Sequence, residues 1–229
     1  MRAKRRRQVA VLGLGRFGST VARELARLGH EVLAVDASEK VTQDVANDVT
    51  HAAEADITDP EALGALGLGD FDTVIVGVSS DLEVSVLATA LLRRLGVKRI
   101  VAKAANELHG SILEEVGASR VVYPERETGF RLAHSFAAPG VGDYLDVAPG
   151  YGVARTVVAE SWIGMSIGEL DMEKSCGVTA VLINRGGDVI VSPPASEILH
   201  PGDVLIVAGL DEDLERLPST TIGPSGPAT

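Results

Sequence analysis

The stretch Gly13-Leu14-Gly15-Arg16-Phe17-Gly18 decides the fold, because it places the spacing G-x-G-x-x-G between an apolar run and a helical pattern. The apolar run Gln8–Leu12 stops at Gly13 and predicts a strand, and residues 16–28 have helical spacing that ends at Gly29. Gly13 would allow the tight turn, Gly15 the approach of the backbone to phosphates, and Gly18 close packing of helix and strand. The stretch therefore predicts a phosphate-binding loop, with a plain strand-to-helix turn as the alternative.

Two charged residues sharpen this reading of the loop. Asp36 ends a second expected strand over residues 31–35, where it could accept hydrogen bonds from a ribose and would disfavour a 2′-phosphate, so NADP is not expected. Arg16 is a fixed cation where phosphate charge would gather, and a triphosphate gains more from it than the pyrophosphate of NAD. The alternative for Arg16 is a surface arginine in the first turn of a helix.

Strands and helices alternate through the first part of the chain, with few hairpin signals. Further strands are expected at residues 50–53, 73–78, 99–102 and 120–122, and helices at residues 40–46, 60–66, 81–95, 106–116 and 125–137. The β-branched run at residues 73–78 is typical of a strand buried on both faces. Six strands separated by helices predict an α/β fold, a doubly wound parallel sheet in the six-stranded Rossmann order.

The pattern changes near residue 138, and strands then dominate. Strands are expected at residues 153–160, 179–184, 189–191 and 204–208, a hairpin loop at residues 184–188, and short helices at residues 167–170 and 211–217. We therefore expect a nucleotide-binding domain over residues 8–138 and a small α+β domain over residues 142–217. Residues 1–7 form a basic tip, and residues 218–229, rich in Pro, Gly, Ser and Thr, are expected to be disordered.

Composition and charge exclude several classes of protein. The 229 residues are 45% hydrophobic but only 3% aromatic, with one cysteine, Cys176, so neither a disulfide framework nor a zinc module is expected. No apolar run is long enough to span a membrane, and no signal peptide is expected. The net charge is −11 although residues 2–7 carry five positive charges, which leaves −16 on the rest. An acidic body is a poor match for nucleic acid, and a regulator that binds DNA through residues 2–7 is kept only as a weak alternative.

Catalytic residues are hard to find. A dehydrogenase needs an acid or base and a substrate-binding cation in its second domain. Four of the five histidines fall in the first domain, and the fifth, His200, falls in a turn. The sequence thus predicts a nucleotide binder that is not an enzyme, with an NAD-dependent oxidoreductase or an NAD(H)-sensing regulator as the alternative.

Several motifs together resemble the RCK (KTN) regulatory subunits of Ktr/Trk potassium-uptake systems. In the first domain these are GLGRFG at 13–18, LGHEVLAVD at 28–36, THA at 50–52, ADIT at 55–58, GASR at 117–120 and VYPE at 122–125. In the second domain, GMSI at 164–167, VSPP at 191–194 and HPGD at 200–203 resemble the RCK_C module. The resemblance covers residues 8–217 and implies an RCK_N domain followed by RCK_C.

The resemblance also implies a ligand, ATP or ADP, and a set of residues that bind it. Gly13, Gly15, Arg16, Phe17 and Gly18 would surround the phosphates, and Asp36 would bind the ribose. Asp56 and Thr58 would lie on the adenine side, Lys103 in reach of phosphate, and Glu125 near the terminal phosphate. There two copies of Glu125 from a dimer could share Mg²⁺ or another divalent cation. An acid at position 125 also suits the first turn of a helix, which is the alternative role.

Partners and location follow from the same resemblance. It implies a homodimer assembled into an octameric ring on the cytoplasmic face of a separate membrane subunit that conducts potassium, with ATP favouring the active ring. The apolar stripe Phe130, Ala133 and Ala137 would pack on the partner, although it could equally belong to this chain's own core. Some RCK_C modules bind cyclic di-AMP; Lys174, Arg185 and the apolar pair at 193–194 are the nearest candidates here.

Overall fold

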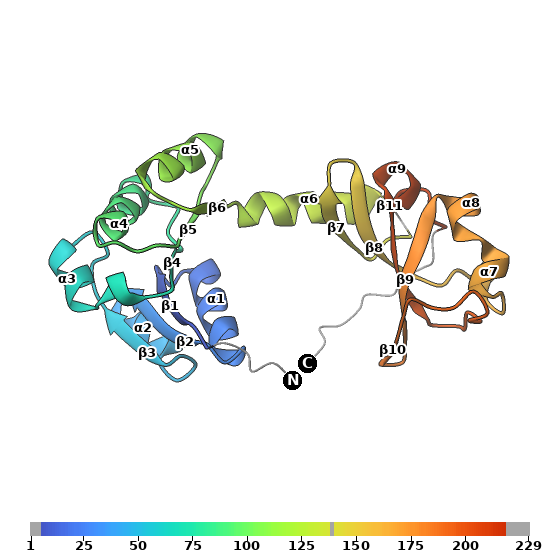
Figure 1. Cartoon of the computed structure of the whole chain (residues 1–229), viewed down its shortest axis with the longest axis horizontal. Helices are drawn as coiled ribbons and strands as arrows, with labels where there is room; N and C mark the ends of the chain where they lie inside the picture. The colour runs from blue at the N-terminus through green and yellow to red at the C-terminus, as the bar shows by residue number, and fades with distance from the viewer. Residues whose placement is uncertain (1–5, 138–139, 219–229) are drawn as a thin grey trace. The chain divides into compact units, whose positions relative to one another are not determined.

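The computed structural model describes residues 6–137 and 140–218, which form two units (Figure 1). By contacts within the chain, the first unit ends at Glu125 and the second begins at Arg126. The expected features at residues 1–5, 138–139 and 219–229 lie outside the described residues. None of the helices in the described ranges is both long and apolar enough to cross a membrane.

The first unit is built on a parallel sheet in the order β3-β2-β1-β4-β5-β6. Its strands are β1 (Gln8–Leu12), β2 (Glu31–Asp36), β3 (His51–Glu54), β4 (Thr73–Val76), β5 (Ile100–Lys103) and β6 (Arg120–Val122). The chain runs outward from β1 to β3, returns to β4 beside β1, and runs outward again. This confirms the predicted doubly wound fold and places its switch point between β1 and β4, where such folds bind ligands.

Helices follow the strands and cover the sheet. They are α1 (Arg16–Arg27), α2 (Glu39–Val45), α3 (Pro60–Ala65), the 3₁₀ turn η1 (Leu68–Asp70), α4 (Leu82–Arg94) and α5 (Glu107–Val116). Three begin at a side chain that accepts a hydrogen bond from the first turn, namely Asp59, Asp81 and Asn106. The strand residues alternate between two clusters: one packs under α3, α4 and α5, the other under α1 and α2.

The burial of β4 differs from the expectation. The strand ends at Val76 rather than at residue 78, and only one of its faces is fully covered. Val74 and Val76 are completely buried under α4 and α5, whereas Thr73 and Ile75 on the opposite face are only partly buried. The reason is that α1 and α2 cover the half of the sheet made by β1, β2 and β3, and no described helix of this unit covers the β4–β6 half on that side.

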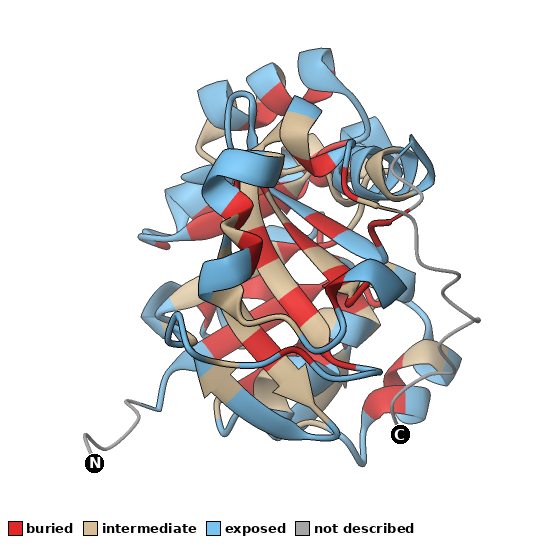
Figure 2. Cartoon of the chain, turned by 90° about the vertical axis from the view of Figure 1, so that its right-hand side faces the viewer, coloured by how far each residue is buried: buried red, intermediate tan, exposed pale blue. Residues whose placement is uncertain are grey.

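The second unit contains an antiparallel sheet in the order β10-β9-β11-β8-β7, which gives it the expected α+β character. Its elements are β7 (Asp143–Ala148), β8 (Tyr151–Val157), the 3₁₀ turn η2 (Glu160–Trp162), α7 (Ile167–Leu170), α8 (Met172–Cys176), β9 (Val178–Arg185), β10 (Asp188–Val191), β11 (Val204–Leu210) and α9 (Asp211–Leu214). The predicted hairpin loop joins β9 to β10, with Gly186 and Gly187 at positive φ. Figure 2 shows buried residues along the strands and exposed ones on the outer surfaces of the helices.

Helix α6 (Pro124–Ala137) connects the two units. The sequence analysis places it with the first domain, whereas residues 126–137 group with the second unit when the chain is divided by its contacts. The rings of Phe130, His134 and Tyr144 pack together, and Arg131 pairs with Asp143 at 3.1 Å. None of the 14 residues of α6 is buried, so most of its surface, including the stripe of Phe130, Ala133 and Ala137, is open to solvent.

An ion-pair network holds the loops at one end of the second unit. The Arg185 guanidinium donates two hydrogen bonds to Asp203, at 2.9 and 2.8 Å, one to Glu197 and one to the carbonyl of Ile198. Asp203 is almost fully buried and also accepts from the N–H of His200. The hydrogen bond from Arg185 holds the pKa of Asp203 below its usual value. Four of the five N–H groups of Arg185 are therefore engaged within the fold, and Asp203 and Glu197 balance its charge.

Candidate functional site

The glycine loop between β1 and α1 is fixed by the neighbouring strands. The N–H of Gly13 donates to the carbonyl of Val35, and the N–H of Gly77 donates to the carbonyl of Leu12. Gly13 has φ +84° and its α-carbon faces Val78, so a side chain would be strained and would collide there. A Cβ on Gly18 would run into the carbonyl oxygen of Gly13, whereas one on Gly15 would meet no atom within 4 Å. Gly13 and Gly18 thus serve packing, and Gly15 leaves open backbone at the start of α1.

Asp36 holds the loop in place. One of its carboxylate oxygens accepts from the N–H of Leu14 at 2.7 Å, and the other accepts from the N–H of Ser38 at 3.0 Å. The residue therefore joins the end of β2 to the middle of the glycine loop. Each carboxylate oxygen has a further lone pair, so Asp36 retains acceptor capacity toward a ribose hydroxyl.

A hollow of about 520 Å³ opens beside the loop, at the carboxyl ends of the strands. Its lining comprises Gly13, Gly15, Arg16, Phe17, Asp36, Gly77, Val78, Ser79, Ser80, Lys103 and Glu125. Residues 77–80 were missed in the sequence, because they match no motif. The topology brings them here, since β4 lies beside β1 and the loops that follow these two strands must face each other.

Two cations and a carboxylate give the hollow its electrostatic character. Arg16 is exposed, and its guanidinium has no hydrogen bond to the described part of the chain. The Lys103 ammonium pairs with Glu125 at 2.6 Å and lies 5.7 Å from the centre of the Phe17 ring. The hydrogen bond from Lys103 lowers the pKa of Glu125, burial opposes this effect, and the charges of Lys103 and Arg16 add to the lowering. Glu125 is therefore ionised at neutral pH.

Three of the expected site residues do not line the hollow. Gly18 packs α1 against the loop, as described above. Asp56 and Thr58 follow β3 in a tight local turn, in which one Asp56 oxygen accepts from both the N–H and the hydroxyl of Thr58. These two bonds lower the pKa of Asp56. The turn is near Asp36, because the N–H of Ala55 donates to the Asp36 carbonyl at 3.0 Å.

The described residues contain no group of three or more His, Cys, Asp or Glu that could hold a metal ion. The carboxylates of the hollow are Glu125 and Asp36, and each Asp36 oxygen already accepts from a backbone N–H, so a cation at Glu125 would need further oxygens from a ligand or from a second chain. His109 is not at the site: it is buried between α4 and α5, with Nε2 2.8 Å from the Ser85 hydroxyl.

Comparison with known proteins identifies the family. Residues 9–124 match the model of the TrkA-N domain, and residues 153–219 match that of the TrkA-C domain. The chain is 38% identical over 211 residues to the "Ktr system potassium uptake protein C" of Bacillus subtilis, covering 92% of this chain and 96% of the relative. That relative is described as a potassium uptake protein, which agrees with the prediction that the chain is not an enzyme.

Solved structures share the architecture. The GsuK RCK domain superimposes with a TM-score of 0.65 at 19% identity, covering 95% of this chain and 48% of that one, so this chain spans about half its length. The NAD(P)-binding domain of an exopolyphosphatase-related protein from Archaeoglobus fulgidus matches 57% of this chain and 98% of its own length, with a TM-score of 0.51 at 26% identity. The chain thus belongs to the TrkA-N/TrkA-C (RCK) family of the Ktr and Trk potassium uptake systems.

Proposed function

We propose that the chain is a regulatory subunit that binds ATP or ADP in the hollow beside the glycine loop and thereby gates a membrane potassium transporter. The observation that carries the proposal is the arrangement of Gly15, Arg16 and Lys103 around this hollow, in a chain 38% identical to a potassium uptake protein. A soluble subunit on the cytoplasmic side of the membrane, acting on a separate translocating subunit, follows from this role.

The residues of the hollow suit a nucleotide with several phosphates. The open backbone at Gly15 and the N-terminus of α1 offer N–H groups and a partial positive charge. Arg16 and Lys103 supply full charges, Asp36 accepts from the ribose, and the turn at Asp56 and Thr58 flanks the adenine. Glu125 would hold a divalent cation only together with phosphate oxygens and, in a dimer, the second copy of Glu125.

Regulation requires that ATP and ADP favour different states of the assembly, because a ligand shifts an equilibrium only through differential affinity. The two ligands differ in the terminal phosphate. Arg16 carries an exposed guanidinium that forms no hydrogen bond or ion pair with a described residue, so it is the group best able to respond to the additional charge. In the proposed complex Arg16 contacts the terminal phosphate, in the same chain or across the dimer, and this contact distinguishes ATP from ADP.

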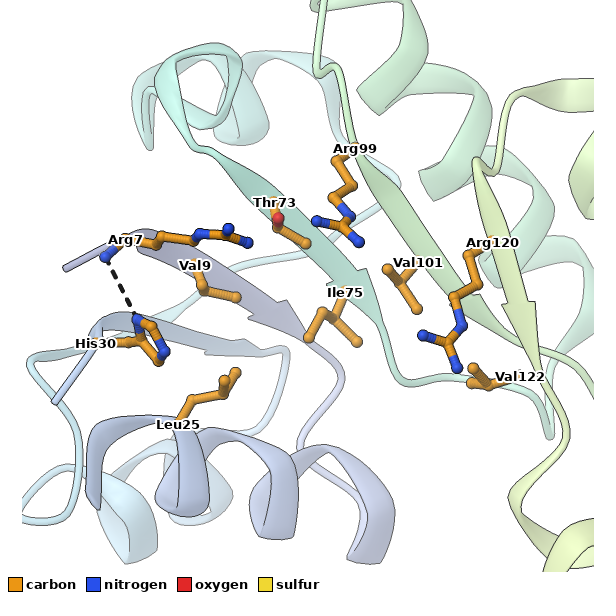
Figure 3. A pocket seen from close by; sticks show the side chains of 10 residues that line it. All are labelled: Arg7, Val9, Leu25, His30, Thr73, Ile75, Arg99, Val101, Arg120 and Val122. Atoms are coloured by element: carbon orange, nitrogen blue, oxygen red, sulfur yellow. Dashed lines mark hydrogen bonds between the residues drawn. The ribbon is translucent and has the colours of Figure 1, made fainter. Parts of the chain in front are cut away.

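Two apolar surfaces without a cover support a homodimer. One is α6, where Leu132 and Phe136 are 56% and 79% exposed. The other is the uncovered sheet face, a hollow of about 650 Å³ whose floor is apolar and whose rim carries three arginines (Figure 3). The lining residues are Arg7, Val9, Leu25, His30, Thr73, Ile75, Arg99, Val101, Arg120 and Val122.

Parallel sheets normally have both faces covered, and a helix with an exposed apolar side is stabilised mainly by packing. In the proposed dimer, α6 of one protomer covers this sheet face of its partner, which satisfies both surfaces at once. Such dimers would assemble further into the octameric ring that the family resemblance implies.

An NAD(H)-sensing regulator is the second candidate. It is favoured by the Archaeoglobus structure, which is described as an NAD(P)-binding domain and is 26% identical to this chain. Asp36 suits the adenosine ribose of NAD as well as that of ATP, and it opposes NADP. A thermal-shift panel of ATP, ADP, NADH and NADPH separates the candidates: stabilisation by ATP and ADP supports the first, and stabilisation by NADH alone supports the second.

The regulatory role itself is tested at the membrane. The tagged chain is incubated with solubilised membranes of its own organism, with ATP or with ADP, and the retained proteins are identified by mass spectrometry. We expect an integral potassium-translocating protein whose flux in vesicles changes when the nucleotide is exchanged. The same potassium flux with ATP, with ADP and without nucleotide would contradict the proposal.

A further inference from the structure

We propose that Lys103 connects ligand binding to Glu125, because the phosphate of the ligand and the Glu125 carboxylate compete for the same ammonium group. This inference rests on the proposed nucleotide-binding function. It goes further in naming the residue pair through which the site responds to phosphate charge.

The two partners of the ion pair are held very differently. Lys103 is the last residue of β5, is paired in register with Val122 of β6, and has a side chain only 12% exposed beside the Phe17 ring. Glu125 lies in the first turn of α6, and its side chain is 71% exposed. Glu125 can therefore turn away into water at little cost, whereas Lys103 stays in the wall of the hollow.

The charges around the hollow determine which cations are available to a phosphate. Arg16 and Lys103 are positive, Asp36 and Glu125 are negative, and the four charges cancel. Asp36 is fixed by the N–H groups of Leu14 and Ser38. Among the described lining residues, Arg16 is the one cation without an acidic partner. The second cation of the hollow, Lys103, is already paired with Glu125, so a phosphate must compete with that carboxylate for the charge of the ammonium group.

The exchange is feasible on energetic grounds. An ion pair with one exposed partner stabilises a protein weakly, because water screens the charges and solvates the carboxylate once it is released. A phosphate group offers more charge and more acceptor oxygens than a carboxylate, so it competes well for the ammonium. A divalent cation would favour the exchange further, since the released carboxylate could become one of its oxygen ligands.

The exchange also changes the chain at an informative position. Glu125 is the last residue of the first unit, and α6 continues from it into the second. When Lys103 binds phosphate instead, the contact between the end of β5 and the first turn of α6 is lost. Phosphate binding in the hollow thereby changes the contacts of the chain at the point where it enters the second unit.

Calorimetric titration of the full chain with ADP, in EDTA to remove divalent cations, tests the competition. Four proteins are compared: wild type, Glu125→Gln, Lys103→Met and the double variant. We expect Glu125→Gln to bind ADP about threefold to tenfold more tightly, because Lys103 is then free of a competing charge. We expect Lys103→Met to bind more weakly, and Glu125→Gln to give a clearly smaller gain in that background.

Matched controls are Glu127→Gln, on the next exposed acid of α6, and Lys98→Met, on an exposed lysine before β5; both should bind ADP as wild type does. Lys103→Gln serves if Lys103→Met does not fold, as judged by circular dichroism. If Glu125→Gln has the ADP affinity of wild type, or if it gains equal affinity with and without Lys103, this inference is overturned while the proposed function stands. If neither wild type nor Glu125→Gln binds any nucleotide, the proposed function fails and this inference fails with it.

Discussion

Alanine at Gly18 and alanine at Gly15 should separate folding from ligand binding. Each variant adds a single methyl group to the glycine loop, and the two sites lie three residues apart. At Gly18 the new Cβ would run into the carbonyl oxygen of Gly13, which is backbone and cannot rotate away. At Gly15 it would meet no heavy atom within 4 Å, and the backbone there has φ −58°, which alanine adopts readily.

The structure gives the sizes of the competing effects at Gly18. Alanine is favoured over glycine inside a helix by about 0.5–1 kcal/mol. Forcing an additional carbon into a packed contact costs about 1–3 kcal/mol, and the upper part of that range applies because the obstacle is backbone. The net loss is then about 1–2 kcal/mol, which lowers the melting temperature by roughly 3–10 °C for a unit of this size. Gly15→Ala at the N-cap should cost less than about 1 kcal/mol.

The assay combines thermal unfolding, followed by circular dichroism, with calorimetric titration of ADP. Gly15→Ala should melt close to wild type but bind about tenfold or more weakly, because its methyl group stands between the backbone N–H groups and the phosphates. Gly18→Ala should lose both stability and affinity. If Gly18→Ala had the same melting temperature as wild type, the close contact with Gly13 would not exist. Wild-type affinity in Gly15→Ala would show that the ligand does not approach this backbone.

Three other predictions concern the rest of the chain. Arg185→Met leaves the buried Asp203 without its cation and should cost about 2–4 kcal/mol in urea unfolding. Arg216→Met removes an exposed arginine whose ion pairs are long, at 3.5 and 3.6 Å, and should cost less than about 0.5 kcal/mol; equal losses would contradict the structural role of the network. Burial lowers the pKa of His109, so the neutral form is favoured in the folded state. The contribution of His109 to the free energy of unfolding should be fully present above pH about 6.5 and should be lost as the pH falls below it. The free energy of unfolding should therefore fall more steeply with decreasing pH in wild type than in His109→Gln, and parallel pH profiles would refute this. Phe136→Glu should convert the proposed dimer to a monomer in analytical ultracentrifugation while the monomer still folds, since this side chain is 79% exposed; an unchanged dimer would exclude α6 from the interface.

Much of the first unit could be predicted because its signals are local. The glycine loop, the β-branched strands and the glycine stops each depend on a few neighbouring residues, and together they leave one topology. What could not be predicted depends on contacts between distant residues. The β-branched run at residues 73–78, which contains β4, is typical of a strand buried on both faces, yet this chain fully covers only one face of β4. The composition of β4 thus fits a second covered face that the single chain does not provide.

The second unit was harder to predict, and β7 and α8 were missed. In β7 only Tyr144 is buried, so the strand lacks the apolar alternation that marks a half-buried strand. Helix α8 has five residues, too few for a helical period to show. At the site, the motif residues Gly13, Gly15, Arg16, Phe17 and Asp36 line one hollow. The position of residues 77–80 in the same lining and the pairing of Lys103 with Glu125 arise from the topology alone. The ligand-binding roles of all these residues stay predictions.

The central claim is that the hollow beside the glycine loop binds an adenine nucleotide and distinguishes ATP from ADP through Arg16. Calorimetric titration of both nucleotides, with Mg²⁺, into wild type and Arg16→Ala tests it most directly. We predict that wild type binds both and that Arg16→Ala loses more affinity for ATP than for ADP, because the guanidinium contributes most where the phosphate charge is greatest. Equal losses for the two nucleotides, or binding of NADH with no binding of either, would contradict the claim.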